Sequence, residues 1–272
     1  MRLKRRYIWL LVGALFLSGI ALAANVKLGE IKPGEYNLKP VTNHLPYTFT
    51  DPDDYRESLQ KVELELGNQE RFRNLPELGM KHPYTGVIEL GDKAQQFGVI
   101  VDVRAEEKRL YIDTNGDGSF AGEPWILLLN EWYGLERYWV IGPEPIRLQV
   151  NFNSEPSRSQ TIEISVSGFL NRPGALSEEK PFLTVAVRTW FLAELIEDGD
   201  VKLAAVVDCN NNGKYNDPED VIFIDYNDDG LFSDDEAIHR KKGIKINSGK
   251  VKLRVDWGIC PQKLVIGGEA DD

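Results

Sequence analysis

Residues 223–232 read Phe-Ile-Asp-Tyr-Asn-Asp-Asp-Gly-Leu-Phe, and two other stretches of the chain follow the same pattern. Residues 206–215 read Val-Val-Asp-Cys-Asn-Asn-Asn-Gly-Lys-Tyr, and residues 110–120 read Leu-Tyr-Ile-Asp-Thr-Asn-Gly-Asp-Gly-Ser-Phe. Each stretch begins with a short apolar run, which favours a buried strand. The Asn-Gly or Asp-Gly pair that follows favours a tight turn. The pattern therefore predicts strands that end in polar loops.

A longer similarity surrounds these stretches. Residues 87–102 resemble residues 195–208, and residues 146–151 (Ile-Arg-Leu-Gln-Val-Asn) resemble residues 251–256 (Val-Lys-Leu-Arg-Val-Asp). Matching residues are separated by roughly 105 to 112 positions, and self-similarity at a nearly constant offset indicates an internal duplication. We place the two β halves at residues 24–152 and 153–272, with one Asp/Asn-rich loop in the first half and two in the second.

The duplication changes the prediction for one segment. Trp190–Ile196 reads locally as a helix, but its counterpart around Tyr84–Leu90 carries Gly86 and precedes a Gly-Asp turn, which is typical of a hairpin. We therefore predict strands at both places. Residues 161–167 and 245–255 alternate apolar and polar residues with a period of two. Short strands separated by turns predict an all-β fold, a sandwich or a barrel-like arrangement, with the polar loops at strand ends.

The loop that starts at Asp225 has the spacing of a calcium loop. Calcium prefers six to eight oxygen ligands, and a twelve-residue loop supplies them from positions 1, 3, 5, 7, 9 and 12, with glycine at position 6. Gly230 and Gly213 stand at position 6 of the loops that begin at Asp225 and Asp208. The predicted ligands of the first are Asp225, Asn227, Asp229, the Leu231 carbonyl, Ser233 and Glu236. Those of the second are Asp208, Asn210, Asn212, the Lys214 carbonyl, Asn216 and Glu219.

The loop that starts at Asp113 fits less well. Its predicted ligands are Asp113, Asn115, Asp117, the Ser119 carbonyl and Glu123. Position 9 is Ala121, position 12 is Pro124, and Glu123 lies one residue early. The alternative is an ordinary hairpin turn, because Asp-Gly is favoured there without any ion.

These loops resemble EF-hand loops and the Asp-rich calcium repeats of thrombospondin type 3 and dockerin modules. The resemblance covers about 40 of the 272 residues, so it concerns sites and not the whole chain. An EF-hand has a helix on each side of the loop, whereas residues 204–207 and 221–224 have the character of strands. The helix-opening switch of calcium sensors is therefore not expected. The resemblance implies structural Ca²⁺ ions at strand ends.

The N-terminus predicts export. Four basic residues precede an apolar run that ends in Ala-Leu-Ala at residues 21–23, so we expect residues 1–23 to be a cleaved signal peptide. An uncleaved membrane anchor is the alternative. Removing residues 1–23 changes the net charge from −11 to −15, with 28 basic and 43 acidic residues remaining. Such a charge disfavours binding to nucleic acids and to anionic membranes. We expect a periplasmic or extracellular protein. Such a compartment permits a disulfide between Cys209 and Cys260, but the sequence does not decide whether it forms.

The sequence favours a calcium-binding role without catalysis. No G-x-S-x-G, H-E-x-x-H or P-loop motif occurs, and the three histidines are far apart in the sequence. The expected partners are calcium ions and a cell-surface protein or glycan. A carbohydrate-binding or adhesion module is the first alternative, and its aromatic residues would be Trp125, Trp132, Tyr133, Tyr138 and Trp139. A hydrolase with a carboxylate pair is the second alternative.

Overall fold

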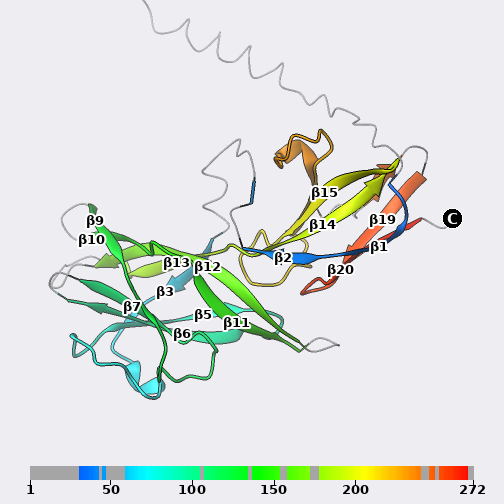
Figure 1. The fold of residues 1–272 in the computed structure, drawn as a ribbon. Helices are drawn as coiled ribbons and strands as arrows, with labels where there is room; N and C mark the ends of the chain where they lie inside the picture. The colour runs from blue at the N-terminus through cyan, green and yellow to red at the C-terminus, as the bar shows by residue number, and fades with distance from the viewer. Residues whose placement is uncertain are drawn as a thin grey trace, which may run out of the picture.

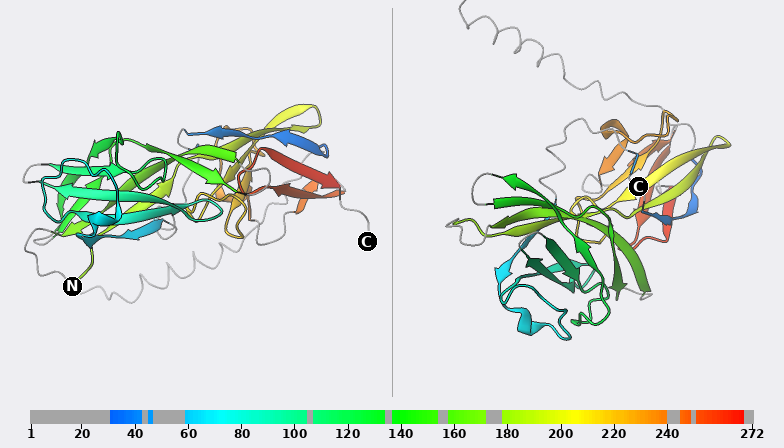
Figure 2. Two further views of the ribbon diagram at one scale, coloured as in Figure 1. Left: turned by 90° about the horizontal axis from the view of Figure 1, so that it is seen from below. Right: turned by 60° about the vertical axis from the view of Figure 1, so that its left-hand side comes forward.

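The computed structural model describes residues 31–42, 45–46, 59–104, 107–133, 137–153, 158–171, 178–239, 245–248 and 251–268. These residues form four antiparallel sheets and two short 3-10 helices, η1 (Gln69–Arg71) and η2 (Asp234–Glu236). The sheets group into two units that lie side by side (Figures 1 and 2). The predicted all-β fold is thus confirmed, in its sandwich form.

The first unit contains a five-stranded and a six-stranded sheet. The five-stranded sheet has the order β4 (Glu65–Leu66), β5 (Tyr84–Leu90), β6 (Gln95–Val103), β7 (Lys108–Ile112), β8 (Trp125–Leu127). The six-stranded sheet has the order β3 (Gln60–Glu63), β13 (Phe182–Val187), β12 (Arg158–Asn171), β10 (Arg137–Ile141), β9 (Leu129–Tyr133), and β11 (Ile146–Phe152) also pairs with β12.

The second unit contains a five-stranded and a four-stranded sheet. The five-stranded sheet has the order β17 (Ala237–His239), β16 (Val221–Ile224), β15 (Asp200–Val207), β14 (Trp190–Glu197), β2 (Lys39–Val41). The four-stranded sheet has the order β1 (Gly34–Asn37), β20 (Lys263–Gly268), β19 (Val251–Trp257), β18 (Lys245–Ser248).

Side-chain alternation explains how these strands form a core. Along β11 every second residue, from Ile146 to Phe152, is buried, and the residues between them are exposed. Period-two alternation places one face of a strand in the core and the other in water. All four residues of β16 are buried, as expected for a central apolar run. One apolar cluster includes buried residues of both units.

Trp190–Ile196 is a strand, as the comparison between the two halves predicts. It lies in β14, which pairs with β15 from Phe191 to Glu197 and with β2 on its other side. Pairing with the neighbouring strands therefore overrides the local helix-forming character of Leu192 to Leu195. Strand propensity alone would not predict a strand here. The predicted strands at 161–167 and 245–255 are also confirmed, in β12, β18 and β19.

The two five-stranded sheets have the same connectivity. In each sheet a hairpin, β5–β6 or β14–β15, is flanked on one side by an earlier strand and on the other by the next two strands of the chain. This is the arrangement that an internal duplication would produce. The duplication itself stays a prediction.

The sheets do not divide at the sequence boundary placed after residue 152. β11 and β12 pair across that boundary, from Ile146↔Ile164 to Phe152↔Arg158. The first unit continues to Val187, and β1 and β2, near the N-terminus, complete the sheets of the second unit. Residues 1–30, with the predicted signal peptide, lie outside the described residues. Among the described residues, the structure contains no helix long and apolar enough to cross a membrane.

Candidate metal centre

The Asp225 loop begins where β16 ends and folds back to η2. Its backbone is shaped by side chains at the predicted ligand positions. Asp225 Oδ2 accepts the N–H of Gly230 at 3.1 Å, and Asn227 Oδ1 accepts the N–H of Asp229 at 3.0 Å. Asp229 Oδ1 in turn accepts the N–H of Leu231 at 2.8 Å. The side chains at positions 1, 3 and 5 therefore all turn toward the inside of the loop.

One oxygen of Asp225 is left without a hydrogen bond. The residue is 3% exposed, and its Oδ1 atom is buried and has no hydrogen-bond partner among the described residues. A buried carboxylate oxygen without a donor costs several kcal/mol unless a cation is present. This atom belongs to the residue at position 1, where the sequence predicts the first ligand. The donor chemistry of the loop thus fits a hard cation.

Glu236 closes the Asp225 loop. Its Oε1 accepts the N–H of Tyr226 at 2.9 Å, and its Oε2 accepts the N–H and the hydroxyl of Ser233 at 3.1 and 3.0 Å. Glu236 is buried. The predicted ligand positions 9 and 12 are therefore in direct contact. Each carboxylate oxygen has further lone pairs, so these hydrogen bonds do not prevent it from binding a cation.

The Asp208 loop follows β15 and repeats the hydrogen bonds from positions 1, 3 and 5, but here Oδ1 of the first aspartate also has a partner, the N–H of Asn212 at 3.3 Å. Asp208 Oδ2 accepts the N–H of Gly213 at 2.6 Å, Asn210 Oδ1 accepts that of Asn212 at 3.3 Å, and Asn212 Oδ1 accepts that of Lys214 at 2.8 Å. Burial, together with the negative charge of Asp220, raises the pKa of Asp208 to about 8. Two acidic side chains are thus buried next to each other in this loop.

The carboxylate that closes the Asp208 loop is Asp220. The predicted ligand at position 12, Glu219, is exposed, whereas Asp220 is completely buried. Asp220 accepts the N–H of Cys209 at 3.1 Å and the N–H of Asp217 at 2.6 Å. Asp220, and not Glu219, therefore closes this loop in the way that Glu236 closes the Asp225 loop. The loop is one residue longer than the twelve-residue spacing assumes.

Asp217 is a further carboxylate that the sequence spacing did not assign. Its Oδ2 accepts the side-chain N–H groups of Asn210 and Asn212 at 3.1 and 2.6 Å, and it lies 3.1 Å from Lys214 Nζ. Burial raises the pKa of Asp217, but these hydrogen bonds outweigh it and lower the pKa below its ordinary value. Asn216, predicted as the ligand at position 9, is half-buried beside it.

The Asp113 loop has the same shape as the other two. Asp113 accepts the N–H groups of Gly116, Asp117 and Gly118 at 2.7 to 3.2 Å. Glu123 Oε2 accepts the N–H and the hydroxyl of Thr114 at 3.1 and 2.6 Å, so Glu123 closes this loop despite lying one residue early. The carboxylate oxygens of Asp113 and Glu123 Oε2 thus already have hydrogen-bond donors within the protein. The hairpin-turn alternative therefore stays open for this loop.

Left-handed backbone conformations recur at two positions of the three loops. Position 6 is glycine, with φ between 75° and 77°, and position 4 has φ between 58° and 70°. Glycine and, less readily, asparagine or aspartate adopt this region without a large steric cost. The residues concerned are Gly116, Gly118, Asn211, Gly213, Asp228 and Gly230.

A lysine from outside the Asp225 loop holds it to β15. Lys202 Nζ donates to the Tyr226 carbonyl at 3.1 Å and to the carboxylate of Asp228, and it lies 3.7 Å from Glu197. Burial alone would lower the pKa of Lys202, but the contact with Asp228 and the surrounding negative charges outweigh it and raise the pKa. Lys202 is separated from the loop in the sequence, so the loop pattern could not reveal it.

Other predicted features are placed as follows. Cys209 and Cys260 are not bonded to each other. Among the predicted aromatic residues, Trp125 is exposed and stacks under Arg109 at 4.4 Å, while Tyr138 lies 4.1 Å from Lys108 Nζ. Trp132 and Tyr133 lie in β9, but their side chains are outside the described set.

No protein family, curated protein or solved structure matches the chain. Within the described ranges, no group of three or more histidine, cysteine, aspartate or glutamate side chains is arranged to hold a metal ion. The predicted ligand sets of the loops also include amide, hydroxyl and backbone carbonyl oxygens, which are outside that class of side chain.

Proposed function

We propose that this chain is an exported calcium-binding protein, in which the ions stabilise loops at strand ends and which has no catalytic activity. The observation that carries the proposal is the Asp225 Oδ1 atom, which is buried and has no hydrogen-bond partner among the described residues. Asp225, Asn227, Asp229, the Leu231 carbonyl, Ser233 and Glu236 would hold the ion. When bound, calcium would supply positive charge to this otherwise acidic loop.

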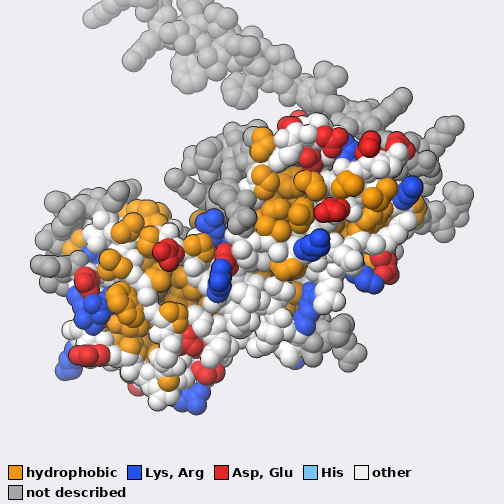
Figure 3. All heavy atoms as spheres, viewed as in Figure 1, with side chains coloured by type: hydrophobic (Ala, Val, Ile, Leu, Met, Phe, Trp, Pro, Cys, Tyr) orange, Lys and Arg blue, Asp and Glu red, His pale blue; other side chains and the backbone are white. Residues whose placement is uncertain are grey.

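The charge distribution supports the proposal. Residues 208–236 contain ten acidic side chains and one basic side chain. Figure 3 shows acidic side chains along the upper edge of the second unit. Like charges that are close together destabilise the folded state, and a bound cation removes that cost. In the Asp208 loop, Asp208, Asn210, Asn212, the Lys214 carbonyl, Asn216 and Asp220 would be the ligands.

Calcium fits these loops better than magnesium or zinc does. The ligands are oxygens, and neither cysteine nor histidine is among them, so zinc has no preferred donor. Magnesium requires six close ligands in a regular octahedron and gives up its water slowly. Loops that mix carboxylate, amide and carbonyl oxygens provide the larger and more flexible coordination that calcium uses.

Calorimetric titration of the metal-free protein tests the proposal. We expect two calcium sites, or three if the Asp113 loop also binds, with magnesium binding much more weakly. Melting temperature is measured in parallel with CaCl₂, and with NaCl at matched ionic strength. Equal stabilisation by sodium, with no change on adding a chelator, would show that these are ordinary acidic turns and would contradict the proposal.

One observation favours a second function, the binding of a glycan. Trp125 is 47% exposed in a strand, β8, that also presents Leu127 to solvent, and Leu129 follows on β9. Exposed tryptophan side chains stack on the apolar faces of sugar rings. Glycan-array binding that disappears in Trp125→Ala, with unchanged calcium titration, would support this function. Binding that survives the substitution would contradict it.

A further inference from the structure

The Asp208 loop lies between the two units (Figure 1) and is hydrogen-bonded to the first one. The backbone N–H of Gly91, in the turn after β5, donates to the Asn212 carbonyl at 2.8 Å. The backbone N–H of Val187, the last residue of β13, donates to Asn211 Oδ1 at 2.7 Å. Both donors belong to the first unit, whereas the loop belongs to the second. The loop therefore makes direct polar contacts across the junction.

Tyr215, two residues after the glycine of this loop, holds the short connection between the units. β13 and β14 are separated by Arg188 and Thr189. The Tyr215 hydroxyl donates to the Thr189 carbonyl at 2.9 Å, and the Tyr215 N–H donates to the Ile259 carbonyl at 2.9 Å. The Tyr215 side chain is completely buried and meets Phe191 edge to face.

The loop also packs closely against the first unit. A Cβ atom added to Gly213 would lie 3.0 Å from the Cβ of Leu90 and 3.1 Å from the backbone nitrogen of Gly91. A side chain at position 213 therefore fits only if the loop or the β5–β6 turn moves. Positions 4, 5, 6 and 8 of the loop thus all contact the first unit, the connection or the neighbouring strands.

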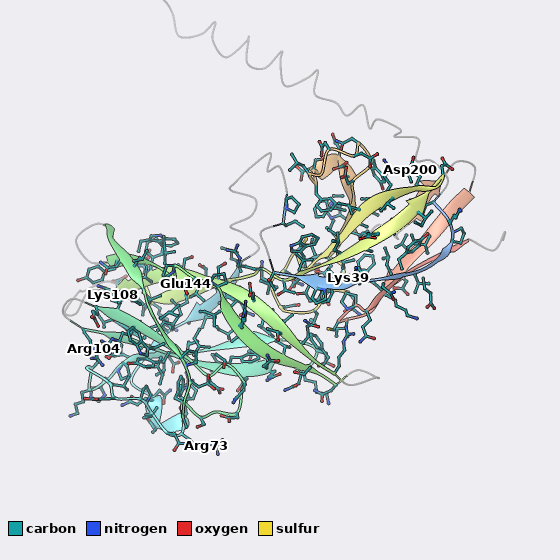
Figure 4. The ribbon with its side chains drawn as sticks, in the orientation of Figure 1. Lys39, Arg73, Arg104, Lys108, Glu144 and Asp200 are labelled. Atoms are coloured by element: carbon teal, nitrogen blue, oxygen red, sulfur yellow. The ribbon has the colours of Figure 1, made fainter. Side chains whose placement is uncertain are left out.

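The Asp225 loop provides a contrast. It lies at the other end of β15, where Asp200 is also found (Figure 4), and its described contacts are with residues of the second unit and with Pro46. Both loops have hydrogen bonds from positions 1, 3 and 5 to backbone N–H groups of the loop, but only the Asp208 loop bonds to β13 and to the β5–β6 turn within the described residues.

We propose that the ion bound by the Asp208 loop fixes the orientation of the two units. This inference rests on the proposed function. The predicted ligands at positions 1, 3, 5 and 7 alternate along the chain with the residues that bridge the units. An ion that holds Asp208, Asn210 and Asn212 in place also holds Asn211, Gly213 and the Asn212 carbonyl. Without the ion, these ligand positions lose their common anchor, and the contacts of Asn211, Gly213 and the Asn212 carbonyl with the first unit are no longer held in one geometry.

Small-angle X-ray scattering of the full chain, combined with calorimetric calcium titration, tests this proposal. We expect the wild type to give a rigid two-lobed profile in calcium and a longer, flexible particle after chelation. Asp225→Asn should lose one calcium site yet respond to chelation as the wild type does. Asp208→Asn should lose a different site and remain flexible in calcium. Circular dichroism confirms that each variant retains its strands.

The outcomes separate this proposal from the one on which it rests. If the wild type binds calcium, and loses one site in Asp208→Asn, but scatters identically with and without calcium, the apolar contacts alone fix the junction and the inference is overturned. The calcium-binding function would then still stand. Since chelation of the wild type needs no substitution, this result does not depend on whether Asp208→Asn folds. Absence of calcium binding in the titration would overturn both proposals.

Discussion

Asp220 accepts the backbone N–H of Cys209 at 3.1 Å, and this contact identifies the residue that closes the Asp208 loop. The same bond recurs in the other two loops, from Tyr226 to Glu236 and from Thr114 to Glu123. In each case the N–H at position 2 binds the closing carboxylate, although that carboxylate stands at position 11, 12 or 13. The hydrogen bond, and not the count of residues, therefore defines the end of each loop.

We expect Asp220→Asn to weaken calcium binding at the Asp208 loop much more than Glu219→Gln does. Each substitution removes one negative charge from neighbouring positions, but Asp220 is buried and bonded within the loop while Glu219 is exposed. Loss of a supporting or ligating carboxylate typically lowers metal affinity by about tenfold or more. Calorimetric titration measures both variants. A larger loss in Glu219→Gln would restore the twelve-residue assignment.

The sequence predicts the inner part of each loop well because that part is local. The side chains at positions 1, 3 and 5 accept backbone N–H groups two to five residues further along the chain, so their residue types report the local geometry directly. The closing carboxylate depends on how the chain returns to position 2, which residue spacing does not determine. Lys202 and Asp217 were missed for a related reason. Lys202 contacts the Asp225 loop from β15, and Asp217 binds Asn212 by a side-chain contact that the Asp-x-Asn pattern does not include.

Asp225→Asn should remove most of the stabilisation that calcium gives to its loop. With a dissociation constant on the order of 10 μM, 1 mM calcium stabilises the folded state by about 2.7 kcal/mol per site. For a chain of this size, that corresponds to a rise in melting temperature of roughly 5–10 °C. Calorimetry with and without calcium measures the loss.

The matched control for that variant is Asp235→Asn. It makes the same change in charge at an exposed residue of the same loop, which is not among the predicted ligands. We expect its calcium response to stay close to that of the wild type. If both variants lose the same stabilisation, general screening of charge accounts for the effect, and a specific site is contradicted.

The fold was predictable at the level of strands, whereas the division into units was not. Local alternation and turn residues identify strands such as β11 and β12, and similarity between the halves corrects β14. The pairing of β1 with β20 and of β2 with β14 joins residues 149 or more positions apart. Such long-range pairing leaves no periodic signal in the sequence, so the boundary placed after residue 152 could not anticipate it.

Gly213→Ala should destabilise the protein more than Gly230→Ala does. Both glycines have φ near 75°, so an added Cβ costs about 1–2 kcal/mol at either position. At Gly230 no atom lies within 4 Å of that Cβ, but at Gly213 it meets Leu90 and the backbone of Gly91. Urea unfolding of both variants gives the two free energies. Equal losses would show that the contact between the Asp208 loop and the first unit is easily displaced.

Cys260 should react slowly with thiol reagents in the folded protein. Burial raises its pKa to about 11, from an ordinary value of 9.0, and the positive charge of Arg158 offsets this only in part. At pH 8 the thiolate, which is the reactive form, should be about 100-fold less abundant than in an unfolded chain. Because the folded-state pKa is the higher one, the neutral thiol stabilises the fold below pH 9, and this contribution is lost as pH rises through about 11. Alkylation rates measured from pH 7 to 11 in Cys209→Ser, in which Cys260 is the remaining cysteine, test this.

Titration of the unfolded, unreduced wild type should find two free thiols, since the cysteines are not bonded to each other. Finding no free thiol there would show that Cys209 and Cys260 form a disulfide, and would contradict this arrangement.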